Sequence, residues 1–253
     1  MDFKTYKSFF AFGCSMTEYH WPTWADIIAQ EIPESYNFGK SGAGNTFISS
    51  QIAEAHHRHK FTSDDLVMCM WSGVGREDRY VNRNWQTPGN IYTQDYYDSK
   101  FIEKYVDIRG YVLRDMSSIA LTTGFLENLG VDFYMLNMMP FNLLQSSKPY
   151  NTESNNDIFY LFQDTLKKIK PDLATTELDN SWPTRNIHHS ANQTIDYHPS
   201  TKQHLQYLQK IFPDITFSDK TIEFVNYYED MINSATHIND ITWNKNKHFP
   251  KRF

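Results

Sequence analysis

Short apolar runs alternate along the chain with stretches in which apolar residues recur every three or four positions. The runs predict strands at residues 8–14, 36–38, 65–71 and 131–139. The periodic stretches predict helices at residues 22–31, 46–60, 113–129, 200–212 and 220–233. Because strands that are apolar on both sides must be covered on both faces, this order predicts a parallel, doubly wound α/β sheet.

Two insertions interrupt this alternation. Residues 76–112 carry aromatic side chains among polar and charged ones, and residues 141–195 are rich in Asn, Ser and Thr around a short amphipathic piece at 157–170. Long insertions after sheet strands often act as lids or binding loops. We therefore expect a single domain over residues 1–253, with these two insertions and a C-terminal extension from about residue 213.

Composition and charge narrow the class of protein. The chain is 40% hydrophobic with a formal net charge of -6, so it reads as globular, without the clustered basic face of a nucleic-acid binder. The chain has one local basic run, residues 56–60, and the simpler interpretation of this run is a solvated helix end. The N-terminal sequence lacks the apolar core of a signal peptide, and no run is long enough to span a membrane. We expect a cytoplasmic protein without nucleic-acid or membrane partners.

The two cysteines, Cys14 and Cys69, lie in apolar runs. They are expected to be buried free thiols in a reducing compartment, because a disulfide framework needs more cysteines. Two cysteines are also too few for a metal cluster, and no histidine pair has the spacing of a zinc protease. The sequence therefore predicts no metal and no cofactor.

Candidate chemistry appears where the strands end. Ser15 follows the first strand after Gly13, which permits a tight exit, and far downstream Asp196 and His198 stand just before a Pro and a predicted helix. Hydroxyl, imidazole and carboxylate are the minimum set for serine-dependent ester chemistry. Gly42, at the end of the second strand, would leave a backbone N–H open to an oxyanion. In open α/β sheets such groups meet outside the carboxyl ends of the strands.

Three segments resemble blocks I, II and V of the SGNH (GDSL-type) hydrolase superfamily, in family order. They are Phe12-Gly13-Cys14-Ser15, Asn37-Phe38-Gly39-Lys40-Ser41-Gly42 and Asp196-Tyr197-His198-Pro199-Ser200. The resemblance implies a three-layer α/β/α sandwich with a five-stranded parallel sheet. It implies Ser15 as nucleophile, His198 as base and Asp196 as the carboxylate that orients it. The backbone N–H groups of Ser15 and Gly42 would then stabilise the oxyanion.

The chain departs from this superfamily at block III. The family places Gly-x-Asn-Asp after the third strand, with the Asn side chain donating to the oxyanion, whereas residues 71–78 here read WSGVGRED. Candidates for the replacement donor are Asn45, Ser72 and Arg76. Candidate substrate-binding residues at this strand end are Trp71, Arg76 and Glu77. A surface pair between Arg76 and Glu77, and a backbone role for Asn45 in its glycine turn, are the alternatives.

Other histidines and aromatic residues have less specific interpretations. His188 and His189 precede Asp196 and are rival bases, but solvated loop histidines are the simpler interpretation. For several aromatic residues packing is favoured over ligand stacking: Trp21, Trp24, Trp182, Trp85, Tyr92, Tyr96 and Tyr97.

Three functions compete. The first is a serine esterase that hydrolyses a small acyl ester; the aromatic insertion and polar loops favour a carbohydrate substrate, specifically an O-acetyl group. The second is an O-acyltransferase, in which a sugar hydroxyl replaces water at the acyl-enzyme, because acceptor choice depends on water exclusion. The third is a binding protein of the same fold with weak turnover. The missing block III Asn favours this third function, and the complete set of Ser15, His198 and Asp196 opposes it.

Overall fold

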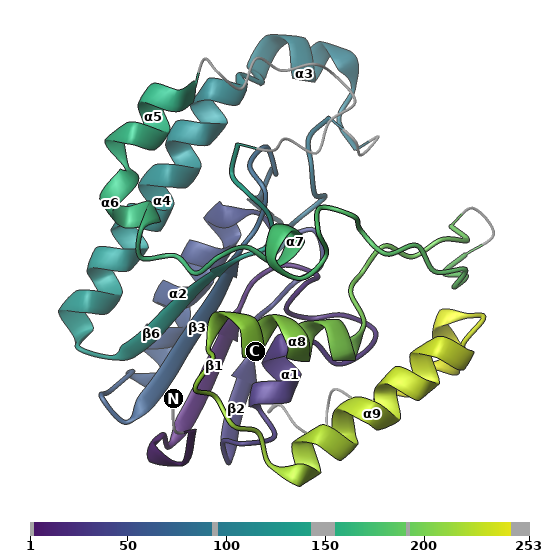
Figure 1. Cartoon of the computed structure of the whole chain (residues 1–253). Helices are drawn as coiled ribbons and strands as arrows, with labels where there is room; N and C mark the ends of the chain where they lie inside the picture. The colour runs from purple at the N-terminus through teal and green to yellow at the C-terminus, as the bar shows by residue number, and fades with distance from the viewer. Residues whose placement is uncertain (1–2, 93–95, 143–154, 191–192, 244–253) are drawn as a thin grey trace.

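The computed structural model describes residues 3–92, 96–142, 155–190 and 193–243 and has a parallel sheet at its centre (Figure 1). The sheet has four strands in the order β2-β1-β3-β6. Their bounds are β1 (Ser8–Phe12), β2 (Glu34–Asn37), β3 (Asp65–Trp71) and β6 (Asp132–Asn137). Every residue of β1 and β3 is buried. Their uninterrupted apolar sequence is therefore explained by cover on both faces.

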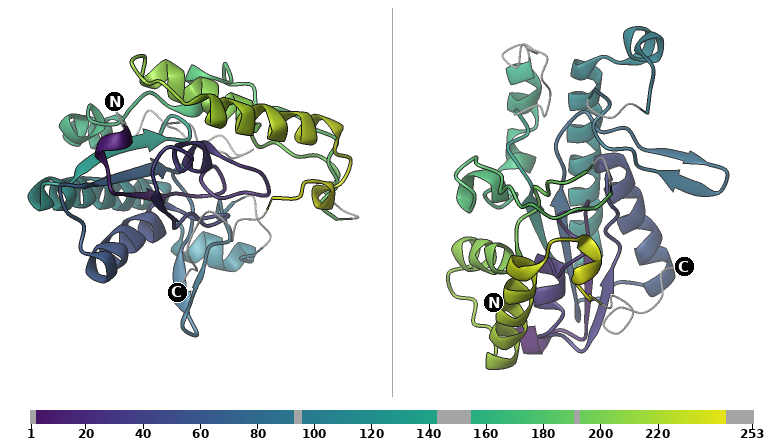
Figure 2. Two further views of the ribbon diagram at one scale, coloured as in Figure 1. Left: turned by 90° about the horizontal axis from the view of Figure 1, so that it is seen from below. Right: turned by 90° about the vertical axis from the view of Figure 1, so that its right-hand side faces the viewer.

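Helices form a layer on each side of this sheet (Figure 2). On one face α2 (Asn45–His59) packs against α4 (Ile108–Leu129). On the other face α1 (Trp24–Ile28) packs against α8 (Thr201–Ile211), and α9 (Asp219–Ser234) packs against α8. The predicted three-layer α/β/α arrangement is confirmed.

The expectation of five strands is wrong for the described residues. Beyond β6 the chain forms one parallel bridge between Met135 and Ile169, and the Lys170 N–H donates to the Met135 carbonyl at 2.8 Å. The next residue, Pro171, has no N–H with which to continue a ladder. The chain then turns into α7 (Leu173–Thr176), so the fifth strand is reduced to a single bridge.

The two insertions hold short elements. Residues 76–112 contain the antiparallel hairpin of β4 (Arg79–Val81) and β5 (Asn84–Gln86), then α3 (Ser99–Tyr105) and the start of α4. The piece predicted at 157–170 is two helices, α5 (Asn156–Leu161) and α6 (Gln163–Leu166). The remaining short elements are the 3₁₀ helices Phe3–Thr5 and Ile238–Asp240. Residues 143–154 and 191–192 of the second insertion lie outside the described residues.

The structure bears on two further expectations, which concern the cysteines and membrane-spanning helices. Cys14 and Cys69 are both buried and unpaired, as predicted. Within the described residues, none of the helices has the length and apolar character needed to cross a bilayer.

Candidate active site

Ser15 lies in a tight turn directly after β1. Gly13 follows the last strand residue at a point where no side chain fits, because a Cβ there would lie 2.0 Å from Thr17 Oγ1. The Lys40 N–H donates to the Gly13 carbonyl at 3.0 Å, which joins this turn to the turn after β2. The result is a nearly buried Ser15 at the carboxyl edge of the sheet.

Gly42 lies in the turn after β2 and lines the same cavity as Ser15. Its φ is +74°, and a Cβ there would lie 2.1 Å from the Thr87 carbonyl oxygen. Glycine is the residue that tolerates both conditions. Within the described residues, neither the Ser15 N–H nor the Gly42 N–H has a hydrogen-bond acceptor. Two unpaired N–H groups beside a serine hydroxyl are the donors that an oxyanion requires.

His198 lies in the segment that leads into α8. Ser200 caps this helix, since its side chain accepts from the Gln203 N–H while its own N–H donates to the Gln203 side chain at 2.9 Å. The Trp21 indole N–H donates to the Pro199 carbonyl at 2.8 Å. The helix cap and this bond fix the segment against the loop after β1, and thereby fix the position of His198.

Asp196 is fully surrounded by hydrogen-bond partners behind His198. Its Oδ1 accepts from the His198 backbone N–H at 2.7 Å and lies 3.3 Å from Nδ1 of the same ring. Its Oδ2 accepts from the Tyr19 hydroxyl and lies 2.6 Å from His189 Nε2. The Tyr19 ring also stacks on the His198 ring, with centroids 3.6 Å apart. These contacts hold the imidazole in one orientation, which is what a triad carboxylate does.

Burial and hydrogen bonding set the protonation states of this group. Burial opposes the ionisation of Asp196, but hydrogen bonds from His198 and Tyr19 outweigh it and hold the pKa of Asp196 below its usual value. Burial lowers the pKa of His198, against the opposite effect of Asp196. Burial and the bond to Asp196 raise the pKa of Tyr19. At neutral pH a neutral His198 therefore stands beside an ionised Asp196, ready to accept a proton.

One cavity of about 710 Å³ joins these parts of the site. Ser15, Gly42, Arg76 and His198 all line it. Its other lining residues are Met16, Ser41, Thr87, Pro88, Gly89, Asn90, Trp182, Gln193 and Tyr197. The fold thus brings the predicted nucleophile, base and backbone donor to one space, from the two ends of the chain.

The bond between Ser15 and His198 is not formed. In the described part of the chain, Ser15 Oγ makes no hydrogen bond, while His198 keeps its Nδ1 contact to Asp196. In hydrolases this contact is often long without substrate and tightens only in the substrate complex. Proton transfer from Ser15 to His198 stays a prediction.

Asn45 and Ser72 conflict with their predicted role as oxyanion donors. Asn45 Oδ1 accepts from the Ser72 N–H at 2.9 Å and from the Ser72 hydroxyl at 3.3 Å. Asn45 Nδ2 donates to the Ser72 carbonyl at 3.1 Å and to Asp115 at 3.0 Å. Both residues are completely buried and absent from the cavity wall. Their polar groups join the start of α2 to the end of β3.

Trp71 and Glu77 also do not fit the predicted substrate contacts. Trp71 is completely buried in the core, and neither residue lines the cavity. The Glu77 carboxylate accepts from the Tyr111 hydroxyl at 2.6 Å and from Arg79 Nε at 2.8 Å. The alternative of a pair between Arg76 and Glu77 is therefore wrong, because other partners occupy this carboxylate.

Arg76 is the block III candidate that does line the cavity. Its side chain donates from Nη1 to the Ala43 carbonyl at 3.0 Å, and Nη2 lies 3.7 Å from Met138 Sδ. Among the described carboxylates none lies within ion-pair distance of it. Its positive charge is close enough to contribute to the lowered pKa of His198. Arg76 thus stays a candidate for stabilising negative charge at this site.

His189 is not the solvated loop histidine that the sequence favoured. Its side chain is only 13% exposed and contacts the buried Asp196. Two backbone hydrogen bonds between Arg185 and Asp196, at 2.9 and 2.8 Å, fold the loop back and bring His189 to that carboxylate. His188 is exposed, as expected. Since His189 does not line the cavity, the structure gives it the place of a partner of Asp196 and not of a rival base.

Sequence reasoning did not name Tyr19 or Tyr197 as site residues, and it favoured packing for Trp182, which lines the cavity. Tyr19 bonds to Asp196, and Trp182 and Tyr197 line the cavity. Tyr197 carries a positional signal, because it lies between Asp196 and His198. Tyr19 and Trp182 stand in no recognised motif, and only the folded arrangement shows where they lie.

Comparisons with known proteins concern the fold alone. No family model matches the chain, and no curated protein matches it. Among solved structures, a putative G-D-S-L family lipolytic protein from Desulfitobacterium hafniense has 14% identity and a TM-score of 0.46, with 81% of this chain and 99% of that chain covered. A lipolytic protein of the same G-D-S-L family from Veillonella parvula has 11% identity and a TM-score of 0.45, with 83% of this chain and 100% of that chain covered. An acetylxylan esterase from Geobacillus stearothermophilus has 16% identity and a TM-score of 0.43, covering 81% and 94%. The function must be argued from the site itself.

Proposed function

We propose that the protein is a serine ester hydrolase of the SGNH type, with Ser15 as nucleophile, His198 as general base and Asp196 as its orienter. The observation that carries this proposal is the single cavity lined by Ser15, His198 and Gly42. Two unpaired N–H groups, those of Ser15 and Gly42, belong to the same wall. Nucleophile, base and oxyanion donors in one space are the working parts of acyl transfer.

The reaction proceeds in two steps. Ser15 Oγ attacks the ester carbonyl carbon while His198 takes the hydroxyl proton, and the oxyanion accepts hydrogen bonds from the Ser15 and Gly42 N–H groups. The tetrahedral intermediate collapses, the C–O bond to the alcohol breaks, and His198 protonates the leaving oxygen. Water then attacks the acyl-enzyme, gives a proton to His198, and releases the acid as Ser15 regains its proton. Asp196 stays ionised and stabilises the imidazolium that forms in each step.

The oxyanion hole has two backbone donors and lacks the side-chain donor of block III. Loss of one such donor in a serine hydrolase lowers kcat by about 10²–10³. Arg76, in the cavity wall, is the candidate that compensates through its charge. We expect this compensation to be partial, so that turnover is slower than in a hydrolase with three neutral donors, while the acyl-enzyme mechanism is unchanged.

A polar ester with a small acyl group suits this cavity. The wall of this cavity contains the amides of Gln193 and Asn90 and the rings of Trp182 and Tyr197. Rings next to amide donors and acceptors suit a sugar, which presents apolar C–H faces and a rim of hydroxyl groups. We therefore propose an O-acetyl group on a carbohydrate as the substrate.

Hydrolysis of p-nitrophenyl acetate by the purified chain tests the reaction class. We expect turnover that Ser15→Ala abolishes, while Ser234→Ala, which removes a hydroxyl from an exposed position on α9, leaves it intact. A fluorophosphonate probe should label the parent at Ser15 and fail to label Ser15→Ala. Equal rates for Ser15→Ala and the parent would sink the assignment.

A further inference from the structure

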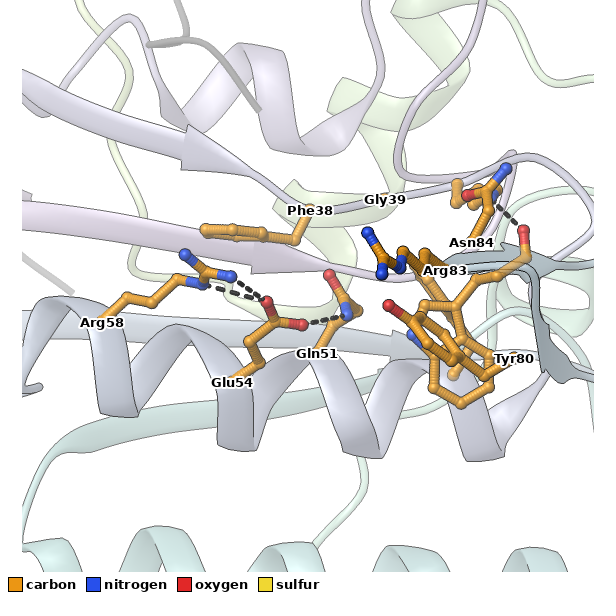
Figure 3. Close-up of a pocket in the computed structure, with 11 residues that line it drawn as sticks. Phe38, Gly39, Gln51, Glu54, Arg58, Tyr80, Arg83 and Asn84 are labelled. Carbon is orange, nitrogen blue, oxygen red and sulfur yellow. Dashed lines mark hydrogen bonds and ion pairs between the residues drawn. The ribbon is translucent and has the colours of Figure 1, made fainter. Parts of the chain in front are cut away.

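A second pocket of about 370 Å³ lies between α2 and the β4–β5 hairpin (Figure 3). One wall is a single stripe of α2, because Phe47, Gln51, Glu54 and Arg58 are spaced by four, three and four residues. Figure 3 shows Arg58, Glu54 and Gln51 following one another along the helix, with Phe38 opposite them. The hairpin closes one end.

The apolar surface of this pocket consists of aromatic rings held by other rings. Phe38 stacks on Phe12 with ring centroids 5.1 Å apart and ring planes 9° apart. One face of the Phe38 ring is therefore covered, and the remaining surface of the ring lines the pocket. Trp85 packs edge-on against Phe47 at 5.6 Å and near-perpendicular to Tyr80 at 5.5 Å. Rings that are fixed before a ligand arrives lose little entropy on binding.

The polar surface is a half-exposed chain of hydrogen-bonded side chains along α2. Glu54 accepts from Arg58 Nη2 at 2.6 Å and Nε at 2.9 Å, and its other oxygen accepts from Gln51 Nε2 at 3.0 Å. This leaves the Gln51 amide oxygen as an acceptor within a row of planar groups. Lys40 Nζ donates to the Trp85 carbonyl at 2.5 Å and joins the pocket floor to the hairpin.

We propose that this pocket is a second saccharide subsite, for sugar units beyond the one that carries the ester. Fixed ring faces beside a row of planar donors and acceptors match a sugar ring, which has apolar C–H faces and a hydroxyl edge. The volume lies in the range of small-ligand pockets, about 300–1,000 Å³. The subsite rests on the proposed function, since it makes the substrate an oligosaccharide ester.

The position of the pocket supports this connection. Residues 39–40 and 84–85 line it, and the segments that continue from them, 41–42 and 87–90, line the catalytic cavity. The Thr87 hydroxyl donates to the Ser41 carbonyl at 2.9 Å and holds the two segments together. The two spaces are therefore separated by one pair of adjoining segments, and the proposal requires an extended chain of sugars to pass over this pair.

Calorimetric titration of the full-length Ser15→Ala variant tests the subsite without turnover. The probes are cellohexaose, mannohexaose and a hexamer of galacturonate, because the pocket lining holds both amide and charged groups and so fits a neutral or an acidic sugar ring. We expect at least one probe to bind, and Trp85→Ala added to Ser15→Ala to weaken it at least tenfold. Gln51→Ala, on the surface of α2, should weaken it at least threefold and covers the case in which Trp85→Ala fails to fold. The matched control is Tyr160→Ala, an aromatic residue 73% exposed on α5.

The outcomes separate the two proposals. Binding that is equally tight in Trp85→Ala and Gln51→Ala, or no binding of any probe to folded Ser15→Ala, overturns the subsite even if the parent hydrolyses p-nitrophenyl acetate. Binding that depends on Trp85 and Gln51, together with a parent that hydrolyses no ester, sinks the proposed reaction and leaves the subsite standing.

Discussion

Replacing Gly42 by alanine should remove one oxyanion donor without touching any triad side chain. A Cβ at this position would lie 2.1 Å from the Thr87 carbonyl oxygen, whereas real Cβ atoms keep at least 3.0 Å, so the turn must move by about 0.9 Å. A misplacement of about 1 Å can cost about 10²-fold in rate, and a lost oxyanion donor about 10²–10³. The φ of +74° adds strain of about 1–2 kcal/mol for a residue with a side chain. We expect Gly42→Ala to lower kcat by about 10²-fold or more and to lower the free energy of unfolding by about 1–3 kcal/mol.

The assay is steady-state hydrolysis of p-nitrophenyl acetate, together with urea unfolding followed by circular dichroism. The matched control is Gly124→Ala in the interior of α4, where an added Cβ meets nothing within 4 Å. Because alanine is the better helix former, this control should gain about 0.5–1 kcal/mol and keep its kcat. A folded Gly42→Ala variant with kcat within threefold of the parent would refute the assignment of the Gly42 N–H to the oxyanion hole.

Three further predictions concern two histidines of the site and one buried amide of the core. Burial lowers the pKa of His198, so kcat/KM should rise with pH in one step centred below the ordinary histidine value of 6.5 and be level by pH 7; a midpoint at or above 6.5 contradicts the neutral base. His189→Ala removes the 2.6 Å partner of Asp196 and should lower kcat about tenfold with KM unchanged, while an effect on KM alone would assign His189 to substrate binding. Asn45→Ala leaves the buried Ser72 N–H unpaired and should cost about 1–3 kcal/mol in urea unfolding, and a smaller loss would mean that water replaces the amide.

The sequence predicted those parts of the fold that depend on local pattern. β3 is predictable over its full length, because an uninterrupted apolar run with charge before it and Ser72-Gly73 after it admits few other structures. The proximity of Asp196 and His198 is also predictable, because only one residue separates them and a Pro and a capped helix follow. Each of these inferences needs information from within about ten residues.

The rest of the site depends on pairings across the chain. His189 reaches Asp196 because the chain between them turns back, held by two backbone hydrogen bonds between Arg185 and Asp196. Tyr19 reaches the same carboxylate from the other end of the sequence. No spacing in the sequence predicts the contacts of His189 and Tyr19 with Asp196, since loop histidines and tyrosines are most often solvated or packed. The fold alone decides which of them meet a buried carboxylate.

Asn45 is engaged in the core and so does not replace the block III Asn that the sequence lacks. The end of β3 has to satisfy the Ser72 N–H and carbonyl inside the core, and the Asn45 amide does so from the first turn of α2. An amide engaged in this way has no donor left to turn toward the cavity, and so the proposed oxyanion hole relies on backbone N–H groups and on Arg76. A backbone N–H keeps its position when the side chain of its residue is changed, as long as the turn keeps its conformation. Gly42 is therefore the position that tests the proposed hole most directly, because a single added methyl group there must move the backbone N–H itself.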